Sequence, residues 1–287
     1  MNSIDIESKK FLGQPKNFVS IFNALLFDGK QVLKSEYLKD ENSELVMNVS
    51  SKHVDIIKRY EDGTYLDLFV IESQSYVDPS MVARVMEYES VARMRYIRQN
   101  FKKHVPMYTR LPMILTVVLY VGESKWNAAK RLSELEIIHP GFEDMFNEFK
   151  LNLIELNTNH KYNTGEKATQ DFFDLLRMIY RKQILKEDLD REFNRDALYF
   201  AYVVTKNKEL LNIYQKSEKG DVKVCRALDE MFEESTNKGI QMGIKQGIEL
   251  NQFEVYQTML DKGFSVKDIA SIFSVSEESI KKLLMKA

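Results

Sequence analysis

The chain has 287 residues, with 44% hydrophobic and 29% charged side chains and a formal net charge of −2. This length and composition are typical of a folded protein with a sizeable core and exclude an intrinsically disordered chain. No apolar run approaches the roughly 20 residues that span a bilayer, and the acidic N-terminus has no apolar signal segment. We therefore expect a cytoplasmic protein with no membrane partner.

Cysteine and histidine usage argues against two kinds of site. Cys225 is the single cysteine, so the chain cannot form an internal disulfide framework. The four histidines, His53, His104, His139 and His160, stand far apart with no paired spacing. A zinc site built from histidine and cysteine is therefore not expected.

The first half of the chain predicts a helix followed by a hairpin. The segment "NFVSIFNALLFDGKQVL" predicts a helix that stops at Asp28 and Gly29, because glycine readily forms a left-handed C-cap. Residues 43–74 predict strands joined by a turn of the Asp-Gly type at Glu61-Asp62-Gly63. Asp55 falls on the first arm of this hairpin and Glu72 on the second.

The segments that follow predict strands flanked by helices. Pro79 breaks the sheet and Ser80 caps a long helix, in which Val85, Tyr88, Ala92 and Tyr96 recur at helical spacing and face the core. Further along lie a buried strand over 113–122, a short strand over 151–157, and helical segments over 168–184 and 195–215. We predict an α/β fold with a mixed β-sheet flanked by helices.

The last part of the chain predicts a separate, all-helical tail, so we divide the chain into domains at 1–234 and 235–287. Glycine recurs every four residues at Gly239, Gly243 and Gly247, each followed by isoleucine. Each glycine disfavours a helix by about 1 kcal/mol relative to alanine. Either close helix packing offsets this cost or the segment is a loose linker.

The final residues, 259–287, have the pattern of a helix-turn-helix. Ser265 with Asp268 resembles a capping box, and Ser276 opens a second helix. Small and apolar residues would fill the space between the helices, namely Ile269, Ala270, Phe273, Val275, Ile280 and Leu283. The second helix opens with two glutamates, which face DNA unfavourably. A hairpin for self-association is therefore as good an interpretation as a DNA reader.

The long helix and the segment after it are locally basic. Residues 81–110 include seven basic residues and only two acidic ones, Glu87 and Glu89. The basic residues are Arg84, Arg93, Arg95, Arg98, Lys102, Lys103 and Arg110. If DNA is bound, Arg84, Arg95, Arg98 and Lys102 are the candidates to contact its phosphates. The alternative is a solvated charged face.

The hairpin carries the candidate catalytic residues. Asp55 and Glu72 lie on paired arms, and Gln74 shares a face with Glu72 because strand side chains alternate. Two carboxylates form an oxygen site suited to Mg²⁺, an ion that polarises a phosphodiester and activates water. The alternative is that these acids lie at strand ends and are solvated or paired with a neighbouring lysine or arginine. The strand pattern alone does not decide between a metal site and this alternative.

A family resemblance adds to this interpretation. The segments "NALLFDGKQVL", "VDIIK", "IESQSYVDPSM" and "VVLYVGESKW" occur in order, with an arginine-containing helix between the last two and the Gly-Ile-rich tail after them. Together they resemble the recombination-promoting nuclease and putative transposase family, which has the PD-(D/E)XK nuclease fold. The resemblance implies Asp55 and Glu72 as Mg²⁺ ligands, with Gln74 where many nucleases of this fold have lysine, and double-stranded DNA as the substrate.

Three functions remain open from the sequence. The first is a Mg²⁺-dependent DNA endonuclease that acts in a recombination-promoting, transposase-like way. The second is an inactive relative that binds DNA or forms oligomers, because Ser20 replaces an acidic residue of the family pattern and Gln74 supplies no charge. The third is an interaction module unrelated to DNA. A homo-oligomer formed through the C-terminal tail fits each of them.

Overall fold

The computed structural model describes residues 3–41, 56–63, 66–101, 103–184, 188–217 and 220–285. The chain forms two compact units, Met1–Leu228 and Asp229–Ala287. The boundary lies within one helix, α7 (Cys225–Asp261), and the domain boundary predicted after residue 234 also falls within it. None of the helices in the described ranges is both long and apolar enough to cross a membrane. The cytoplasmic location stays a prediction.

The first unit begins with helices and the main sheet. Its elements are α1 (Ser3–Leu12), α2 (Pro15–Phe27), β1 (Leu38–Asp40), β2 (Ile56–Glu61), β3 (Leu66–Gln74), α3 (Met81–Asn100), β4 (Met113–Tyr120) and β5 (Asn152–Glu155). The unit continues with α4 (Lys167–Arg181), β6 (Glu192–Phe193), α5 (Arg195–Thr205), α6 (Lys208–Lys216) and β7 (Val222–Lys223). Short 3₁₀ turns cover Ser35–Tyr37, Leu132–Glu134 and Glu143–Met145.

The main sheet is mixed, with five strands in the order β1-β2-β3-β4-β5. Strand β2 is antiparallel to β1 and β3, whereas β4 is parallel to β3 and β5. A parallel pair needs a crossover connection, and α3 lies in the connection between β3 and β4. The predicted α/β fold, a mixed sheet flanked by helices with a helical C-terminal region, is confirmed.

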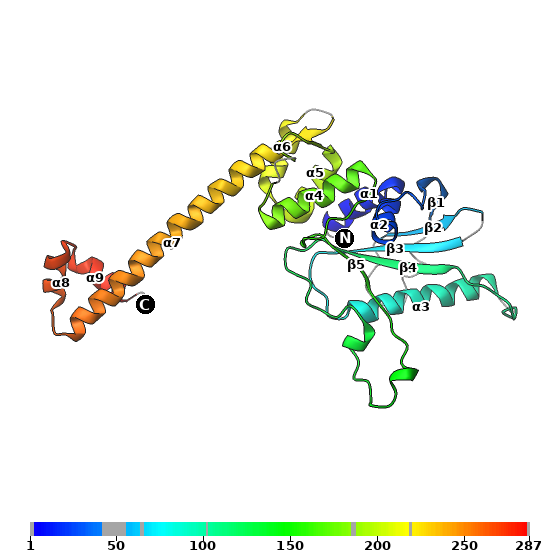
Figure 1. Ribbon diagram of the computed structural model, residues 1–287, viewed down its shortest axis with the longest axis horizontal. Helices are drawn as coiled ribbons and strands as arrows, with labels where there is room; N and C mark the ends of the chain where they lie inside the picture. The colour runs from blue at the N-terminus through cyan, green and yellow to red at the C-terminus, as the bar shows by residue number, and fades with distance from the viewer. Residues whose placement is uncertain are drawn as a thin grey trace. The chain divides into compact units, whose positions relative to one another are not determined.

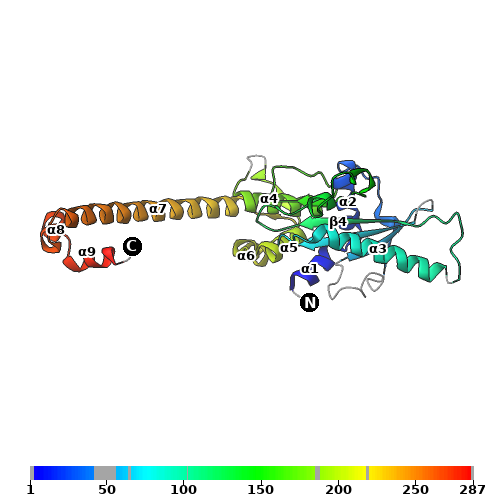
Figure 2. The same ribbon diagram turned by 90° about the horizontal axis from the view of Figure 1, so that it is seen from below.

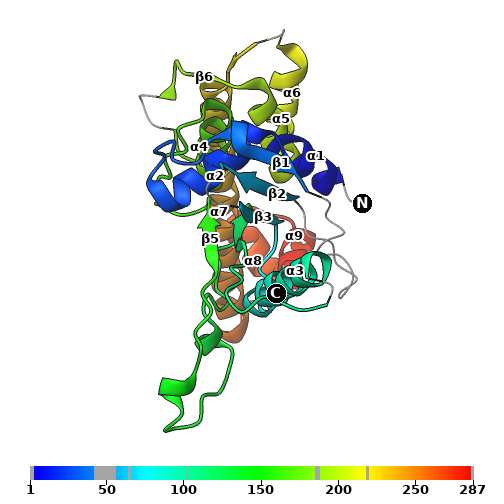
Figure 3. The ribbon, with the colours of Figure 1, turned by 90° about the vertical axis from the view of Figure 1, so that its right-hand side faces the viewer.

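The two faces of this sheet carry different helices (Figures 1 and 2). On one face Tyr88 and Ala92 of α3 belong to an apolar cluster with Leu68 and Val70 of β3. On the other face the ring of Phe69 stacks on a phenylalanine of α2, Phe22, with centroids 4.8 Å apart. Figure 3 shows the same arrangement, with β1, β2 and β3 side by side between α2 and α3. Glu72, two residues after Val70, therefore belongs to the α3 face.

Helix α2 ends close to the predicted position but with a different cap. Asp28, and not only Gly29, takes a left-handed conformation, with φ of 51° and 78° respectively. Aspartate tolerates this region better than most residues, and the Asp28 amide closes the helix on the carbonyl of Asn23. Glycine is still required at the next position, since a Cβ on Gly29 would lie 2.5 Å from the side chain of Asn163.

The helical segment predicted over 195–215 is two helices, α5 and α6. Lys206 ends α5 in a left-handed conformation with φ of 56°. Asn207 then begins α6, and its side chain accepts a hydrogen bond from the amide of Glu209. The apolar periodicity continues across this break, and its one local signal is Asn207, a favoured N-cap residue.

A cluster of buried charges ties α4 to the segment after it. The Arg191 guanidinium contacts three carboxylates, those of Asp171, Asp174 and Asp188. Asp171 is fully buried, and it also accepts a hydrogen bond of 2.7 Å from the amide of Asn194, which caps α5. Burial alone would lower the pKa of Arg191, but its bonds to Asp174 and Asp171 outweigh burial and raise that pKa. The guanidinium therefore stays charged.

The second unit consists of the remainder of α7 with α8 (Val266–Phe273) and α9 (Glu277–Leu284). Residues 235–250, with all three tail glycines, lie inside the continuous helix α7, so the loose-linker alternative is wrong. A small apolar core is formed by Tyr256, Ile269, Ala270 and Ile280.

The helical hairpin at the end of the chain follows the predicted capping pattern. The capping box of Ser265 and Asp268 is formed, and the Ser276 side chain accepts a bond from the amide of Ser279. Two residues predicted to fill the space between the helices, Phe273 and Val275, are instead exposed. They flank the turn, and Phe273 packs edge-on against Tyr256 rather than between α8 and α9.

Ile269→Ala is expected to unfold the end of this unit. The side chain is fully buried in a core of few residues, and removing such a side chain costs about 2–5 kcal/mol. Amide hydrogen exchange in α8 and α9 should accelerate in the variant. The control is Ile272→Ala on the same helix, where the side chain is exposed; equal exchange in the two variants would show that Ile269 does not hold this hairpin.

Candidate active site

Glu72 is a buried carboxylate near the end of a central strand. It lies on β3, its side chain is only 4% exposed, and strand alternation turns it toward α3. The Arg84 guanidinium, in the first turn of α3, donates from Nη2 to Glu72 Oε1 over 2.9 Å. The negative charge of Glu72 is therefore balanced by a cation from the helix that crosses this face.

Arg84 is held by two further side chains. Its Nη1 donates to Asp78 Oδ2 over 2.5 Å, and Nε and Nη2 donate to the Tyr88 hydroxyl over 3.0 and 2.8 Å. Asp78 is fixed in turn, because its Oδ1 accepts from both the amide and the hydroxyl of Ser80. We call Glu72, Asp78, Arg84 and Tyr88 the arginine clamp.

The electrostatics of the arginine clamp favour a charged guanidinium between two carboxylates. Burial raises the pKa of Asp78, but bonds from Ser80 and Arg84 outweigh it and lower that pKa below its ordinary value. Burial lowers the pKa of Arg84, and bonds from Tyr88 and Asp78 reverse the effect, so its pKa is raised. Burial also raises the pKa of the Tyr88 hydroxyl. The arginine is therefore cationic and Asp78 anionic at neutral pH.

Gln74 lies on the same face of β3 as Glu72, as expected for residues two apart on a strand. Its side chain is buried, and among the groups that the structure describes its Nε2 has no hydrogen-bond partner. A buried amide without a partner costs free energy, so this position is unfavourable unless something binds there. The chain keeps a polar group at this point of an otherwise apolar strand.

The other predicted site residues are divided among three places. Asp55, predicted as the second carboxylate, and Lys102 lie outside the described residues. Arg84 belongs to the arginine clamp and is 14% exposed, so it does not lie on an open surface. Arg95 is half-buried and Arg98 is exposed on the last turns of α3. The structure thus brings Glu72 and Arg84 into contact and places Gln74 beside Glu72 along the strand.

Ser20, the residue that replaces an acid of the family pattern, lies on α2. Its hydroxyl is hydrogen-bonded to the carbonyl of Asn17, over 2.7 Å, and to the Thr169 hydroxyl of α4, over 2.8 Å, and the side chain is fully buried. Helix α2 packs on the face of the sheet opposite to the Glu72 side chain. Ser20 therefore joins two helices.

Sequence reasoning missed the part that Asp78 and Tyr88 play at this site. "Asp-Pro-Ser" was interpreted only as a sheet end and a helix cap, and Tyr88 only as a core residue. Glu89, which sequence reasoning counted only as one of two acids in this segment, is buried and accepts a bond from the amide of Thr116 in β4. The sequence does offer one signal for Asp78. It lies just before α3 and six residues before Arg84, close enough for the two charges to pair.

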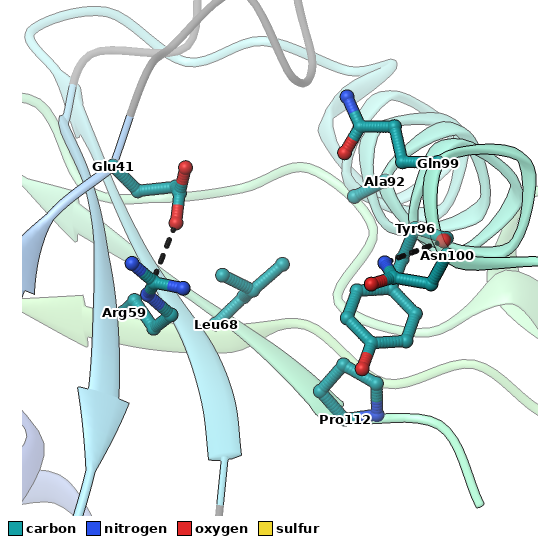
Figure 4. A pocket seen from close by; sticks show the side chains of 8 residues that line it. All are labelled: Glu41, Arg59, Leu68, Ala92, Tyr96, Gln99, Asn100 and Pro112. Carbon is teal, nitrogen blue, oxygen red and sulfur yellow. Dashed lines mark hydrogen bonds and ion pairs between the residues drawn. The ribbon is translucent and has the colours of Figure 1, made fainter.

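A separate cavity lies at the other end of α3 (Figure 4). It has a volume of about 240 Å³ and is lined by Glu41, Arg59, Leu68, Ala92, Tyr96, Gln99, Asn100 and Pro112. Arg59 forms an ion pair with Glu41 at its rim. Along α3 its lining begins at Ala92, one turn after Tyr88, and it includes none of the four residues of the arginine clamp. This cavity therefore lies beside the arginine clamp and does not contain it.

The donor atoms near Glu72 are of the kind that a hard divalent cation prefers, namely carboxylate and amide oxygens. Within the ranges that the structure describes, no three His, Cys, Asp or Glu side chains gather as a metal site. Asp55, however, is not in those ranges. The Glu72 carboxylate is already paired with Arg84, so a divalent cation would have to displace that guanidinium. The described residues supply the Glu72 carboxylate and the Gln74 amide at this point, and Mg²⁺ binding stays a prediction.

The mixed sheet flanked by helices, with a buried carboxylate on its hairpin strand, is an α/β architecture that is consistent with a nuclease-like core. Residues 6–210, most of the chain, match the model of the family described as "Putative transposase, YhgA-like". The chain belongs to this family of putative transposases, and the resemblance predicted from its sequence is confirmed. No curated protein and no solved structure matches the chain.

Proposed function

We propose that the protein is a Mg²⁺-dependent endonuclease that cleaves double-stranded DNA. One observation carries the proposal: Glu72 is buried on the hairpin strand and paired with Arg84, 2.9 Å away. A buried carboxylate is costly unless a cation or hydrogen bonds compensate it. The core strand β3 carries the buried Glu72 carboxylate and, two residues later, the buried Gln74 amide. Two such polar groups in an apolar strand fit a site that binds charged ligands.

The side chains have distinct roles in this proposal. Glu72 and Asp55 would hold Mg²⁺, an ion that would supply polarisation of the phosphodiester and activation of water when bound. Asp55 immediately precedes Ile56, which pairs with Ile71, the residue before Glu72. The Gln74 amide orients the water, and the Arg84 guanidinium stabilises negative charge at the phosphate.

The basic side chains after Arg84 supply the DNA contacts. Arg95, Arg98 and Lys102 bind the phosphate backbone through contacts that carry no sequence information. Arg98 is exposed, which supports this role. Arg93 pairs with Glu89 at 2.9 Å and is not among these proposed contacts.

The direct test is cleavage of supercoiled plasmid by the full chain with Mg²⁺ and with EDTA. Nicking is expected with Mg²⁺ only, and Asp55→Ala should remove it, because one of two ligand charges is lost. Equal nicking by the wild type and Asp55→Ala would exclude this site as the source of the activity. Plasmid topology on agarose gels gives the readout.

A second candidate is a relative that binds DNA without cleaving it. The observation that favours it is the same ion pair, since Arg84 already neutralises Glu72 and a cation must compete with it. This candidate predicts DNA binding that weakens with salt and no turnover at any Mg²⁺ concentration. Turnover that Glu72→Ala removes would rule it out.

We also propose that the chain forms homo-oligomers through α7. At 100° per residue, Gly239, Gly243 and Gly247 share one side of the helix with Ile240, Ile244 and Ile248, while Lys238, Lys245 and Glu249 lie on the other. The three isoleucines are exposed, and a Cβ on any of the three glycines would meet no described atom within 4 Å. Small residues let a second helix approach closely, so this side suits a second copy.

Ile244→Glu is expected to shift the protein from oligomer to monomer, because it buries a charge in that contact. Multi-angle light scattering on the full chain measures the change in mass. The matched control is Met242→Glu on the opposite side, since Met242 and Ile244 are 63% and 58% exposed. An Ile244→Glu protein with the mass of wild type, or equal effects of both substitutions, would contradict this interface.

A further inference from the structure

Asp78 has no place among the proposed metal ligands, yet it uses both carboxylate oxygens. Its Oδ1 binds the amide and hydroxyl of Ser80, at 2.9 and 2.6 Å, where α3 begins. Its Oδ2 binds Arg84 Nη1 at 2.5 Å. The side chain is 9% exposed. Asp78 thus connects a rigid helix end to the guanidinium that faces Glu72.

The contacts of Arg84 separate into one that can be exchanged and three that fix the side chain. The exchangeable contact runs from Nη2 to Glu72, because the Glu72 carboxylate is also the group proposed to bind a cation. The bonds to Asp78 and to the Tyr88 hydroxyl involve neither Glu72 nor Gln74. A planar guanidinium has five donors in a fixed fork, so two partners are enough to set its plane.

We propose that Asp78 is a positioning residue that holds Arg84 in place for a phosphate. The proposal rests on the nuclease function proposed above. When a divalent cation takes the Glu72 carboxylate, Asp78 and Tyr88 keep the guanidinium where it is. Nη2 then donates to a phosphate oxygen of the DNA instead of to Glu72. Arg84 therefore exchanges one anionic partner for another without rearranging.

A purely structural role for Asp78, as the residue that fixes Ser80 before α3, makes different predictions. Asp78→Asn separates the two roles, because aspartate and asparagine both accept from the backbone two residues on, so Oδ1 can still accept from Ser80. The new amide group replaces the anionic oxygen that faces Arg84 Nη1. Only the contact to the guanidinium is therefore lost. An exposed ion pair, Asp190 with Arg226, supplies the control substitution Asp190→Asn.

The first measurement follows the arginine side chains of the full chain by ¹⁵N NMR. In the wild type, Arg84 should give resolved Nη signals from slow rotation of a guanidinium held on several sides, and Mg²⁺ should shift the Nη2 signal as Glu72 is released. Asp78→Asn should speed the rotation of the Nη1 group, which donates to Asp78 in the wild type, whereas Asp190→Asn should not. Slow Nη1 rotation that persists in Asp78→Asn would overturn the proposal.

The second measurement is Mg²⁺-dependent plasmid nicking as a double-mutant cycle. Asp78→Asn should lower turnover about tenfold, the scale seen when the partner of a site residue is removed. It should have no further effect in the Arg84→Gln background, because it acts through Arg84. Independent, additive losses would overturn the positioning role. If the wild type does not cut at all, the proposed function fails, and the NMR comparison still decides whether Asp78 positions Arg84.

Discussion

Glu72→Gln should lower Mg²⁺-dependent DNA cleavage by roughly a hundredfold or more. The substitution keeps the shape of the side chain and an oxygen for Arg84, but removes the charge that attracts a divalent cation. An active-site cation supplies several kcal/mol of transition-state stabilisation, and each 1.36 kcal/mol is a factor of ten in rate. Initial rates of plasmid nicking over a range of Mg²⁺ concentrations measure the loss, and excess Mg²⁺ should not restore the rate.

Glu61→Gln is the matched control for this experiment. This substitution is the same chemical change on the neighbouring strand β2. The Glu61 side chain, however, is exposed and pairs with Lys39 at the far end of the hairpin. The Glu61→Gln protein should therefore cleave at the wild-type rate. If Glu72→Gln cuts as fast as Glu61→Gln, the catalytic carboxylate is not on β3.

Arg191→Met should lower the free energy of unfolding of the first unit by about 3 kcal/mol. The substitution leaves Asp171, Asp174 and Asp188 without their shared cation, and breaking a buried ion pair costs about 3–5 kcal/mol. The lower end applies because Lys167 and Arg177 still contact two of these carboxylates. Urea denaturation followed by circular dichroism gives the value from the midpoint and slope.

Arg226→Met provides the comparison for that measurement. Arg226 pairs with Asp190, and both side chains are largely exposed to solvent. Exposed pairs contribute between zero and about 1 kcal/mol. A midpoint for Arg191→Met that equals that of Arg226→Met would show that the buried carboxylates are compensated without Arg191.

The hairpin and the α3 face could be predicted because their signals are local. An Asp-Gly turn between apolar runs indicates a hairpin, and alternation along β3 gives the shared face of Glu72 and Gln74. The match of Val85, Tyr88 and Ala92 to the buried side of α3 follows from helical spacing alone. Each of these inferences compares residues a few positions apart.

The arginine clamp could not be predicted because it depends on which charges meet in space. Counting residues made Arg84 one of several basic groups suited to DNA, whereas burial decides that it pairs with Glu72 and Asp78. The buried position of Glu89 could not be predicted for the same reason. Its carboxylate accepts from the Thr116 amide of β4, a contact between residues 27 positions apart that no local pattern encodes.

The Tyr88 side chain lies in two environments, an apolar one at its ring and a charged one at its hydroxyl. Its ring belongs to the apolar cluster with Val70 and Ala92, and its hydroxyl accepts two bonds from Arg84. Packing between α3 and the sheet therefore sets where a positive charge sits relative to Glu72. A substitution at Tyr88 would therefore change both the packing of α3 on the sheet and the position of the Arg84 charge.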